Sequence, residues 1–213
     1  MRLFALITLW FSALPVMATP VFEHQIRASL KPEAHALMVT DTIVWPEPPA
    51  RTPVFELHAG LDPEVLEGAE LEFMGRVQGA IPLERYRLKL EHGARRATLR
   101  YGGRLHHPLD EFGEGVGRSR QMTPGYIAED GVYLGGGSGW VPYFGPQQRL
   151  IFTLDVEVPA GWSAVSQGAA SERRDVTRWT ERLPQDQIYL MAGPFHVSRQ
   201  RGRLAEAQVY LRE

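Results

Sequence analysis

The sequence predicts an all-β fold, an antiparallel β-sandwich, and three observations support this prediction. Apolar and polar residues alternate in many short segments, and a period of two is typical of strands with one buried face. Pro and Gly separate these segments at intervals that are common in sandwich proteins. Helical periodicity is scarce after residue 18, so sheets are expected to supply the core.

Nine strands are predicted from this alternation. In the clearest segment apolar residues occupy every second position, and Ile151, Thr153, Asp155 and Glu157 lie between them. This segment is expected to be a half-buried antiparallel strand. The predicted strands are Phe22–Leu30, Ala36–Trp45, Val54–His58, Leu83–Leu90, Arg96–Tyr101, Leu150–Val158, Val176–Leu183, Ile188–Ala192 and Ala207–Leu211.

The segments between these strands carry three further predictions. His92 and Gly93 separate two alternating segments and predict a β-hairpin. The segment Asp62–Leu66 begins with an acid, a proline and a second acid, which predicts a helix of at most two turns. Periodicity is lost over Gly102–Gly139, where glycines cluster, and this predicts a long loop in which functional residues are expected.

Composition excludes several classes of function. The 23 Lys and Arg residues are balanced by 25 Asp and Glu residues, so no positive field exists that would attract nucleic acid or anionic lipid. The chain has no Cys, which excludes disulfides, a thiolate nucleophile and a cysteine zinc site. We therefore expect no nucleic-acid partner and a fold that is held together by its core alone.

Residues 1–18 resemble a signal peptide that forms a short N-terminal helix. A cationic start precedes an apolar run over Leu3–Leu14, and Val16–Ala18 offers the small residues that signal peptidase accepts. The run is shorter than the roughly 20 residues that span a bilayer. We expect cleavage after Ala18, one domain over residues 19–213, a periplasmic or secreted location and no membrane association after cleavage.

The motifs for catalysis or metal binding are incomplete. The glycine runs Gly113–Gly117 and Gly135–Gly139 lack the strand-to-helix setting of a phosphate loop or a hydrolase nucleophile, so they favour tight turns. Among the seven His residues only His106 and His107 are neighbours, and adjacent strand residues point to opposite faces. We predict no catalytic residue and no metal ligand here. A hydrolase that uses Ser138 or His106 is the least favoured alternative.

An aromatic segment is the most informative feature of the predicted loop. Trp140, Tyr143 and Phe144 follow the glycines, and Tyr126 and Tyr133 precede them. These rings could form a platform for a ligand or partner, or they could plug the core beneath the loop. Aromatic side chains dominate both settings, so the sequence leaves both interpretations open.

Separated motifs, taken in order, resemble the N-terminal β domain of the aminopeptidase N and leukotriene hydrolase family of zinc metallopeptidases. The segment VPYFGPQQRLIF is similar to the family's Phe-Pro-Cys-Phe-Asp-Glu-Pro motif, with Gly145 in place of the Asp-Glu pair. The motifs together cover residues 22–213. The similar segments are TLRYGGRL (98–105), GVYL (131–134), VPYFGPQQRLIF (141–152), LDVEVPAGWSAVSQG (154–168) and residues 179–195.

The resemblance implies a saddle-like β-sandwich that packs on a thermolysin-like catalytic domain. In this family the zinc-binding helix and the general-base glutamate lie further along the chain, so zinc is expected only in a catalytic domain outside this sequence. The position that helps to bind the amino end of a substrate falls near Leu134, and Glu129 is the nearest acid. The predicted substrate or interface residues are Glu129, Tyr133, Trp140, Tyr143 and Phe144.

The sequence thus predicts a non-catalytic domain or fragment of an exported, aminopeptidase-like zinc metallopeptidase that supports the catalytic domain and shapes a peptide cleft. The expected partners are that catalytic domain or another periplasmic protein, and a peptide. No cofactor is expected in the chain itself, and whether the chain takes part in catalysis is left open. The alternative is a stand-alone periplasmic β-sandwich module that binds peptide, glycan or a partner protein.

Overall fold

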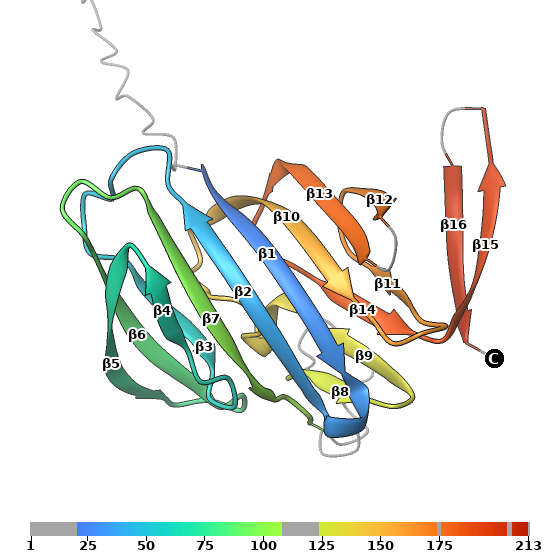
Figure 1. Cartoon of the computed structure of the whole chain (residues 1–213), viewed down its shortest axis with the longest axis horizontal. Coiled ribbons are helices and arrows are strands. Elements are labelled where there is room, and N and C mark those ends of the chain that lie inside the picture. The colour runs from blue at the N-terminus through green and yellow to red at the C-terminus, as the bar shows by residue number, and fades with distance from the viewer. Residues whose placement is uncertain (1–20, 108–123, 174–175, 204–205, 213) are drawn as a thin grey trace, which may run out of the picture.

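The computed structural model describes residues 21–107, 124–173, 176–203 and 206–212 (Figure 1). The predicted signal peptide and the run Gly113–Gly117 lie outside these residues. The described chain consists of strands and two short 3-10 helices, so the all-β prediction is confirmed. Within these ranges, no helix combines the length and the apolar character that a membrane span requires.

The described residues form sixteen strands in four sheets. Eight of the nine predicted strands match an observed strand to within two residues at each end. The exception is Arg96–Tyr101, because the observed strand β7 continues to Arg104. The elements are β1 (Val21–Lys31), η1 (Pro32–Ala34), β2 (Ala36–Val44), β3 (Val54–His58), β4 (Glu64–Glu67), β5 (Ala69–Val77), β6 (Leu83–Leu90), β7 (Arg96–Arg104), β8 (Tyr126–Ala128), β9 (Gly131–Leu134), η5 (Gly136–Ser138), β10 (Arg149–Glu157), β11 (Ser163–Val165), β12 (Ala169–Arg173), β13 (Val176–Gln185), β14 (Leu190–Gly193), β15 (Phe195–Arg201) and β16 (Glu206–Arg212).

A seven-stranded sheet in the order β12-β13-β10-β1-β2-β7-β4 forms the body of the molecule. Its strand pairs are antiparallel except one: β1 and β10 run parallel. The sequence predicted only antiparallel neighbours for β10, so this parallel pair is a correction. The predicted burial of β10 is confirmed, because Leu150, Phe152, Leu154 and Val156 are buried.

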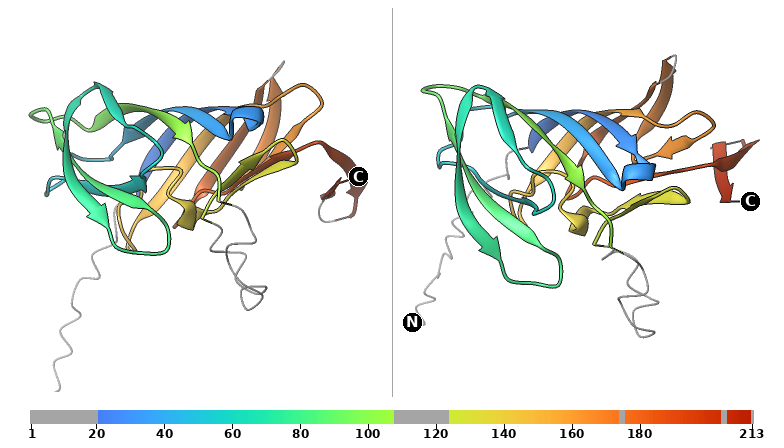
Figure 2. Two further views of the ribbon diagram at one scale, coloured as in Figure 1. Left: turned by 90° about the horizontal axis from the view of Figure 1, so that it is seen from below. Right: turned by 60° about the horizontal axis from the view of Figure 1, so that its bottom comes forward.

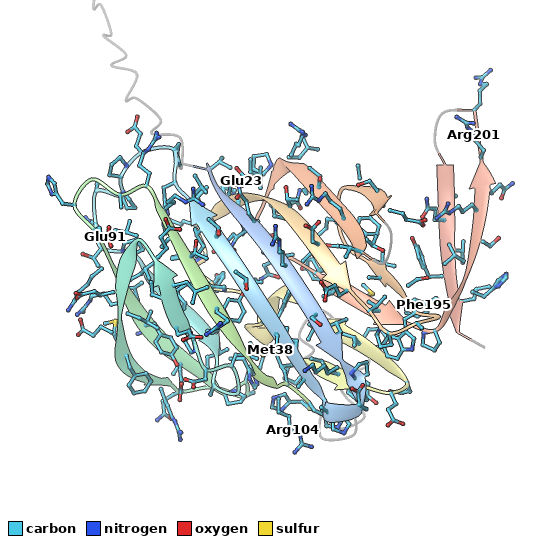
Figure 3. The ribbon with its side chains drawn as sticks, in the orientation of Figure 1. Glu23, Met38, Glu91, Arg104, Phe195 and Arg201 are labelled. Atoms are coloured by element: carbon cyan, nitrogen blue, oxygen red, sulfur yellow. The ribbon has the colours of Figure 1, made fainter. Side chains whose placement is uncertain are left out.

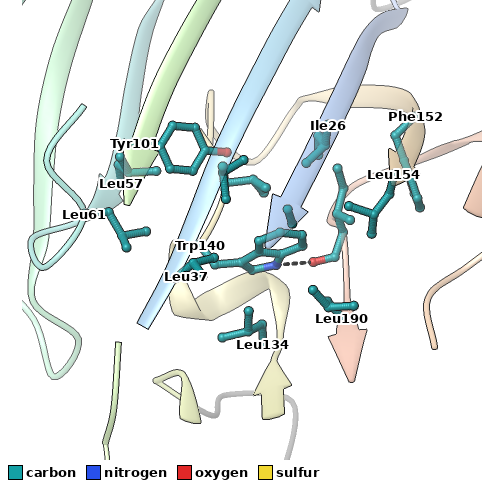
Figure 4. Packing of buried hydrophobic residues seen from close by; sticks show 14 of the residues in the cluster. Ile26, Leu37, Leu57, Leu61, Tyr101, Leu134, Trp140, Phe152, Leu154 and Leu190 are labelled. Carbon is teal, nitrogen blue, oxygen red and sulfur yellow. Dashed lines mark hydrogen bonds between the residues drawn. The ribbon is translucent and has the colours of Figure 1, made fainter. Parts of the chain in front are cut away.

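Two smaller sheets cover the buried face of the large sheet (Figure 2). One has the order β11-β14-β9-β8 and the other has the order β3-β6-β5. A single core contains residues from all three sheets, such as Leu37, Leu57 and Leu190 (Figure 4). The β15–β16 hairpin stands beside this body, with Phe195 at its base and Arg201 near its tip (Figure 3).

The hairpin predicted at His92 and Gly93 is wrong. Strand β6 pairs with β3 and β5 in the three-stranded sheet, whereas β7 pairs with β2 and β4 in the large sheet. The turn itself forms, because Gly93 has a φ of 74° and the Ala94 N–H donates to the Glu91 carbonyl oxygen over 2.9 Å. The turn therefore passes the chain from one sheet to the other instead of joining two paired strands.

The helix predicted at Asp62–Leu66 is also wrong. Glu64–Glu67 form β4, one of the two edge strands of the large sheet. Val65 lies opposite Leu99, and the Glu64 carboxylate accepts a hydrogen bond from the Arg100 guanidinium. A helix this short closes few internal hydrogen bonds, whereas the sheet edge offers the same residues a ladder partner.

Strand β7 continues through two glycines that were expected to lie in the long loop. A Cβ at Gly102 would lie 2.7 Å from the Leu37 carbonyl oxygen, and a Cβ at Gly103 would lie 2.1 Å from the carbonyl oxygen of Gly60. Gly103 also has a φ of 149°. Glycine is needed here because neighbouring backbones approach too closely for any side chain. The predicted loop also contains β8, β9 and η5, so it is more regular than expected.

One polar pair lies sealed in the core of the large sheet. The side chains of His24 on β1 and Asp41 on β2 are fully buried, and Nδ1 of His24 lies 2.7 Å from Oδ2 of Asp41. The two residues are diagonal neighbours across the strand pair, because His24 lies opposite Ile43. Tyr101 on β7 is also buried, and its pKa is raised by burial and by the Asp41 carboxylate.

Removing one member of this pair should cost more stability than removing both. We expect His24→Phe to lower the free energy of unfolding by about 3 kcal/mol, because Asp41 keeps a buried carboxyl group that has lost its histidine partner. The double variant His24→Phe/Asp41→Leu should recover at least half of that loss. Urea denaturation of the single and double variants measures the difference, and strictly additive losses would contradict this prediction.

Candidate interaction surface

The four-stranded sheet has one buried face and one outward face. Ala164, Ala192, Val132 and Ile127 lie opposite one another across its four strands, and all four are buried against the core. Successive residues of a strand point to opposite faces, so the residues next to these four point away from the core.

The outward residues form one row of large side chains, termed here the tyrosine–methionine row. Val165 lies opposite Met191, Met191 opposite Tyr133, and Tyr133 opposite Tyr126. Met191 is 44% exposed, whereas the other three residues are half-buried and Val165 also packs against the core. At the end of the row the Tyr126 hydroxyl donates to Oδ1 of Asp130 over 2.7 Å. The row combines apolar contact area with tyrosine hydroxyls, which suits a protein interface.

Two of the predicted site residues belong to the core. Trp140 is fully buried, and its indole N–H donates to the Ile188 carbonyl oxygen over 2.9 Å (Figure 4). Phe144 packs among other rings, with its centroid 5.2 Å from Phe22 on β1 and 5.7 Å from Phe55 on β3. These two residues fit the interpretation of the aromatic segment as a core plug.

The aromatic segment is held along the open edge of β3. Glu56 and Tyr143 exchange two backbone hydrogen bonds, each 2.9 Å long. The His58 N–H donates to the Gly139 carbonyl oxygen over 2.8 Å. Gly139 has a φ of 66°, and a Cβ there would lie 2.5 Å from the Leu83 side chain. This glycine therefore makes a tight turn, which the sequence predicted for the run.

Ser138 is part of this turn. Its side chain is buried, and its hydroxyl donates to the Gly135 carbonyl oxygen over 2.6 Å. The hydroxyl is thus engaged in closing the short helix η5, and it is not presented to solvent. This placement fits a turn residue and gives no support to a hydrolase mechanism through Ser138.

The remaining predicted site residues lie in two places. Tyr143 is half-buried beside β3, where burial and the carboxylates of Glu56 and Asp186 raise its pKa. Glu129 is exposed in the turn between β8 and β9, and Tyr133 belongs to the tyrosine–methionine row. The fold therefore brings Glu129 and Tyr133 to one hairpin and separates them from Trp140 and Phe144.

The sequence analysis missed Val165 and Met191 as members of the tyrosine–methionine row. Val165 ends a strand of three residues, too short for alternation to be recognised. A signal existed for Met191, because it lies between Leu190 and Ala192 in a predicted strand and so alternates with them. Its position opposite Tyr133 depends on sheet register, which the sequence does not reveal.

A pair of histidines lies at the end of β3. Nε2 of His58 and Nε2 of His107 are 2.8 Å apart. The Gly60 N–H donates to Nδ1 of His58 over 3.0 Å, so the proton of neutral His58 is on Nε2 and is donated to His107. Burial and the neighbouring His107 lower the pKa of His58 to about 4, against an opposing effect of Glu84. Within the described ranges, no three His, Asp or Glu side chains gather as metal ligands.

The outer face of the large sheet is polar, in contrast to the tyrosine–methionine row. A depression of about 490 Å³ there is lined by residues that include Arg27, Thr40 and Arg100. Arg178 and Asp155 form an ion pair with two hydrogen bonds of 2.5 and 2.6 Å in the same depression. Met38 is the exposed apolar residue of this lining (Figure 3). Such a face is suited to water more than to an apolar partner surface.

Comparison with known proteins confirms the fold resemblance. The chain is similar to the M1 zinc metallopeptidase of Deinococcus radiodurans, solved with a Tyr-Ser-Ala substrate, with a TM-score of 0.55 and 21% identity over 88% of this chain and 46% of that one. Yeast LTA4 hydrolase gives a TM-score of 0.58 at 14% identity over 88% of this chain and 31% of that one. An aminopeptidase N family protein of Idiomarina loihiensis gives 0.53 at 10% identity, over 88% and 32%.

The chain therefore has the fold of the N-terminal β domain of such metallopeptidases, and it spans less than half the length of each of these three chains. No protein-family profile matches the sequence, and no curated protein matches it.

The His58–His107 pair should make stability depend on pH. The pKa of His58 is about 4 in the folded chain and about 6.5 when unfolded, so the unfolded chain binds more protons between these values. Stability should be complete above pH of about 6.5 and fall by up to about 3 kcal/mol as the pH drops through about 4. The measurement is urea denaturation across this range.

A matched pair of variants isolates the effect of His58. His58→Asn keeps an acceptor for the Gly60 N–H but cannot be protonated, so its stability curve should lose most of this slope. His92→Asn, which changes an exposed histidine in a turn, should keep the slope. Equal slopes in the natural chain and the His58 variant would count against the assignment.

Proposed function

We propose that this chain is a non-catalytic β domain that supports the catalytic domain of a zinc peptidase, and that it docks through the tyrosine–methionine row. The observation that carries the proposal is that 88% of the chain superposes on less than half of each similar metallopeptidase. The rest of such a metallopeptidase, which includes its catalytic domain, would need a surface of this β domain on which to pack.

The chemistry of the row supports its choice as the docking surface. Met191 and Tyr133 are adjacent on a sheet face whose reverse side is buried, so their backbone is already ordered before a partner binds. Tyr and Met are enriched at interface centres, whereas paired charges such as Arg178 and Asp155 on the large sheet are not. We therefore place the catalytic domain against the four-stranded sheet.

We further propose that the β8–β9 hairpin helps to shape a peptide cleft. Its turn exposes Glu129, and its second strand carries Tyr133. The carboxylate would pair with the cationic amino end of a peptide, and the aromatic ring would pack against one of the peptide's side chains. The zinc ion would be held by the catalytic domain, and this chain would supply the wall of the cleft.

Export is part of the same proposal. It is supported by the cationic start and the apolar run of residues 1–18, and by a chain without Cys, which needs no oxidative folding after transport. The mature domain would then meet its catalytic partner in the periplasm or outside the cell.

A binding experiment tests the docking surface. The partner is the product of a neighbouring reading frame that encodes a His-Glu-x-x-His segment, and absence of such a frame would favour the stand-alone binding module. We expect the double variant Tyr133→Asp/Met191→Asp to weaken binding at least tenfold, because two charges would be buried without partners. Isothermal titration calorimetry gives the dissociation constants.

The matched control is Phe73→Asp on β5. Phe73 is 57% exposed, but it lies on the three-stranded sheet. Binding by this variant should equal that of the natural chain. If Phe73→Asp weakens binding and the double variant does not, the docking surface has been placed on the wrong sheet.

The non-catalytic role is tested separately. The purified chain should not hydrolyse aminoacyl-nitroanilide or short peptide substrates, with or without added zinc, because the proposal gives the zinc site to the partner. Adding the partner should restore hydrolysis. Clear turnover by the chain alone would refute the proposal whatever the result of the binding experiment.

A further inference from the structure

We infer that His35 and His106 form a binding site for a divalent transition-metal ion at the open edge of β8. His35 lies in the turn between β1 and β2, directly after η1, and His106 follows the end of β7. The site is separate from the zinc of the proposed catalytic domain, and it does not depend on the proposed function.

The hydrogen bonds of the two rings fix the state of their nitrogens. Nδ1 of His35 lies 2.7 Å from the Ile127 carbonyl oxygen, and Nδ1 of His106 lies 2.9 Å from the same oxygen. A carbonyl oxygen only accepts, so both Nδ1 atoms must carry a proton. A neutral imidazole with its proton on Nδ1 has a lone pair on Nε2. Histidines that bind metals through Nε2 commonly donate the other N–H to a carbonyl in this way.

The backbone holds both rings in place. The two ring centroids are 4.1 Å apart, and both residues are half-buried. His35 has a left-handed conformation with a φ of 54°, and its carbonyl oxygen accepts from the Leu105 N–H over 2.9 Å. Metal–nitrogen bonds of about 2.1 Å let one ion join nitrogens up to about 4.2 Å apart. Because the two rings lie against each other, rotations about their side-chain bonds would bring both Nε2 atoms within this reach of one ion.

Comparison with the His58–His107 pair shows why the Nε2 atoms of His35 and His106 can bind a metal ion. In the His58–His107 pair the Gly60 N–H occupies Nδ1 of His58, so the proton is on Nε2 and closes the contact between the two rings. In the His35–His106 pair one carbonyl oxygen accepts hydrogen bonds from both Nδ1–H groups, so both Nε2 lone pairs remain available. The same residue type thus gives a closed pair in one place and a pair of ligands in the other.

The donor set selects the class of metal. Two imidazoles suit Cu²⁺, Ni²⁺ and Zn²⁺, and Cu²⁺ binds most tightly in this series. Among the described residues no third His, Asp or Glu completes the site, so water would fill the other positions. A bound ion would tie the β1–β2 turn to the end of β7 beside the edge strand β8. This would stabilise the corner of the molecule next to Tyr126, whose ring centroid lies 5.1 Å from that of His106.

Titration of the purified full chain with Cu²⁺ tests the inference. Electron paramagnetic resonance counts the nitrogen ligands, and thermal unfolding reports the coupling to stability. We expect one ion with two imidazole nitrogens and a melting temperature that rises with Cu²⁺. In His35→Asn/His106→Gln the affinity should fall at least about tenfold and the rise should vanish. Asn is chosen because it tolerates the left-handed conformation of residue 35.

Two controls make the result decisive. His92→Asn/His196→Gln removes two exposed histidines elsewhere and should leave Cu²⁺ binding unchanged. His106→Gln alone, whose amide can still donate to Ile127, should lose one nitrogen from the spectrum even if the double variant folds poorly. Unchanged affinity in the His35/His106 variants, a single-nitrogen spectrum of the natural chain, or loss of binding in the His92/His196 control would overturn the inference.

Discussion

The parallel pairing of β1 with β10 is the constraint on which the rest of the fold depends. Val21 lies opposite Arg149 and Ser29 opposite Glu157, so the start of the domain pairs with a segment far along the chain. Parallel strands cannot be joined by a tight turn and need a long crossover. Everything from β2 to η5 lies within this crossover. It supplies β2, β7 and β4 of the large sheet, the whole three-stranded sheet, and β8 and β9 of the four-stranded sheet.

The aromatic segment at the end of the crossover packs against the large sheet and covers the core there. Phe144 contacts Phe22 on β1 and Phe55 on β3, so one ring joins the large sheet to the three-stranded sheet. It also lies 6.4 Å from the ring of His24, whose buried pair with Asp41 is thereby kept from solvent. The motif that resembles the metallopeptidases thus has a structural task in this chain, which is to close the core.

The two outer faces of the sandwich differ in polarity. The large sheet turns Thr and paired charges outward, such as Arg178 with Asp155. The four-stranded sheet turns Met191 and two tyrosines outward over a row of buried small and aliphatic residues. Because the sheet orders the backbone of each face before any partner binds, the difference lies in the side chains, and we propose docking only at the face that carries Met191 and the tyrosines.

Alternation along the chain was sufficient to determine the fold class and most long strands, because burial of every second residue is a local consequence of the extended backbone. Local patterns gave wrong predictions where a neighbouring strand determined the structure. Residues 64–67 form strand β4 because β7 lies beside them. Glycine is needed at residues 102 and 103 because the backbones of β2 and Gly60 approach too closely for a side chain. The same holds for the candidate sites. Tyr133 could be named from the sequence, but its contact with Met191 and the shared carbonyl of His35 and His106 join residues far apart in the chain, and only tertiary packing sets such registers.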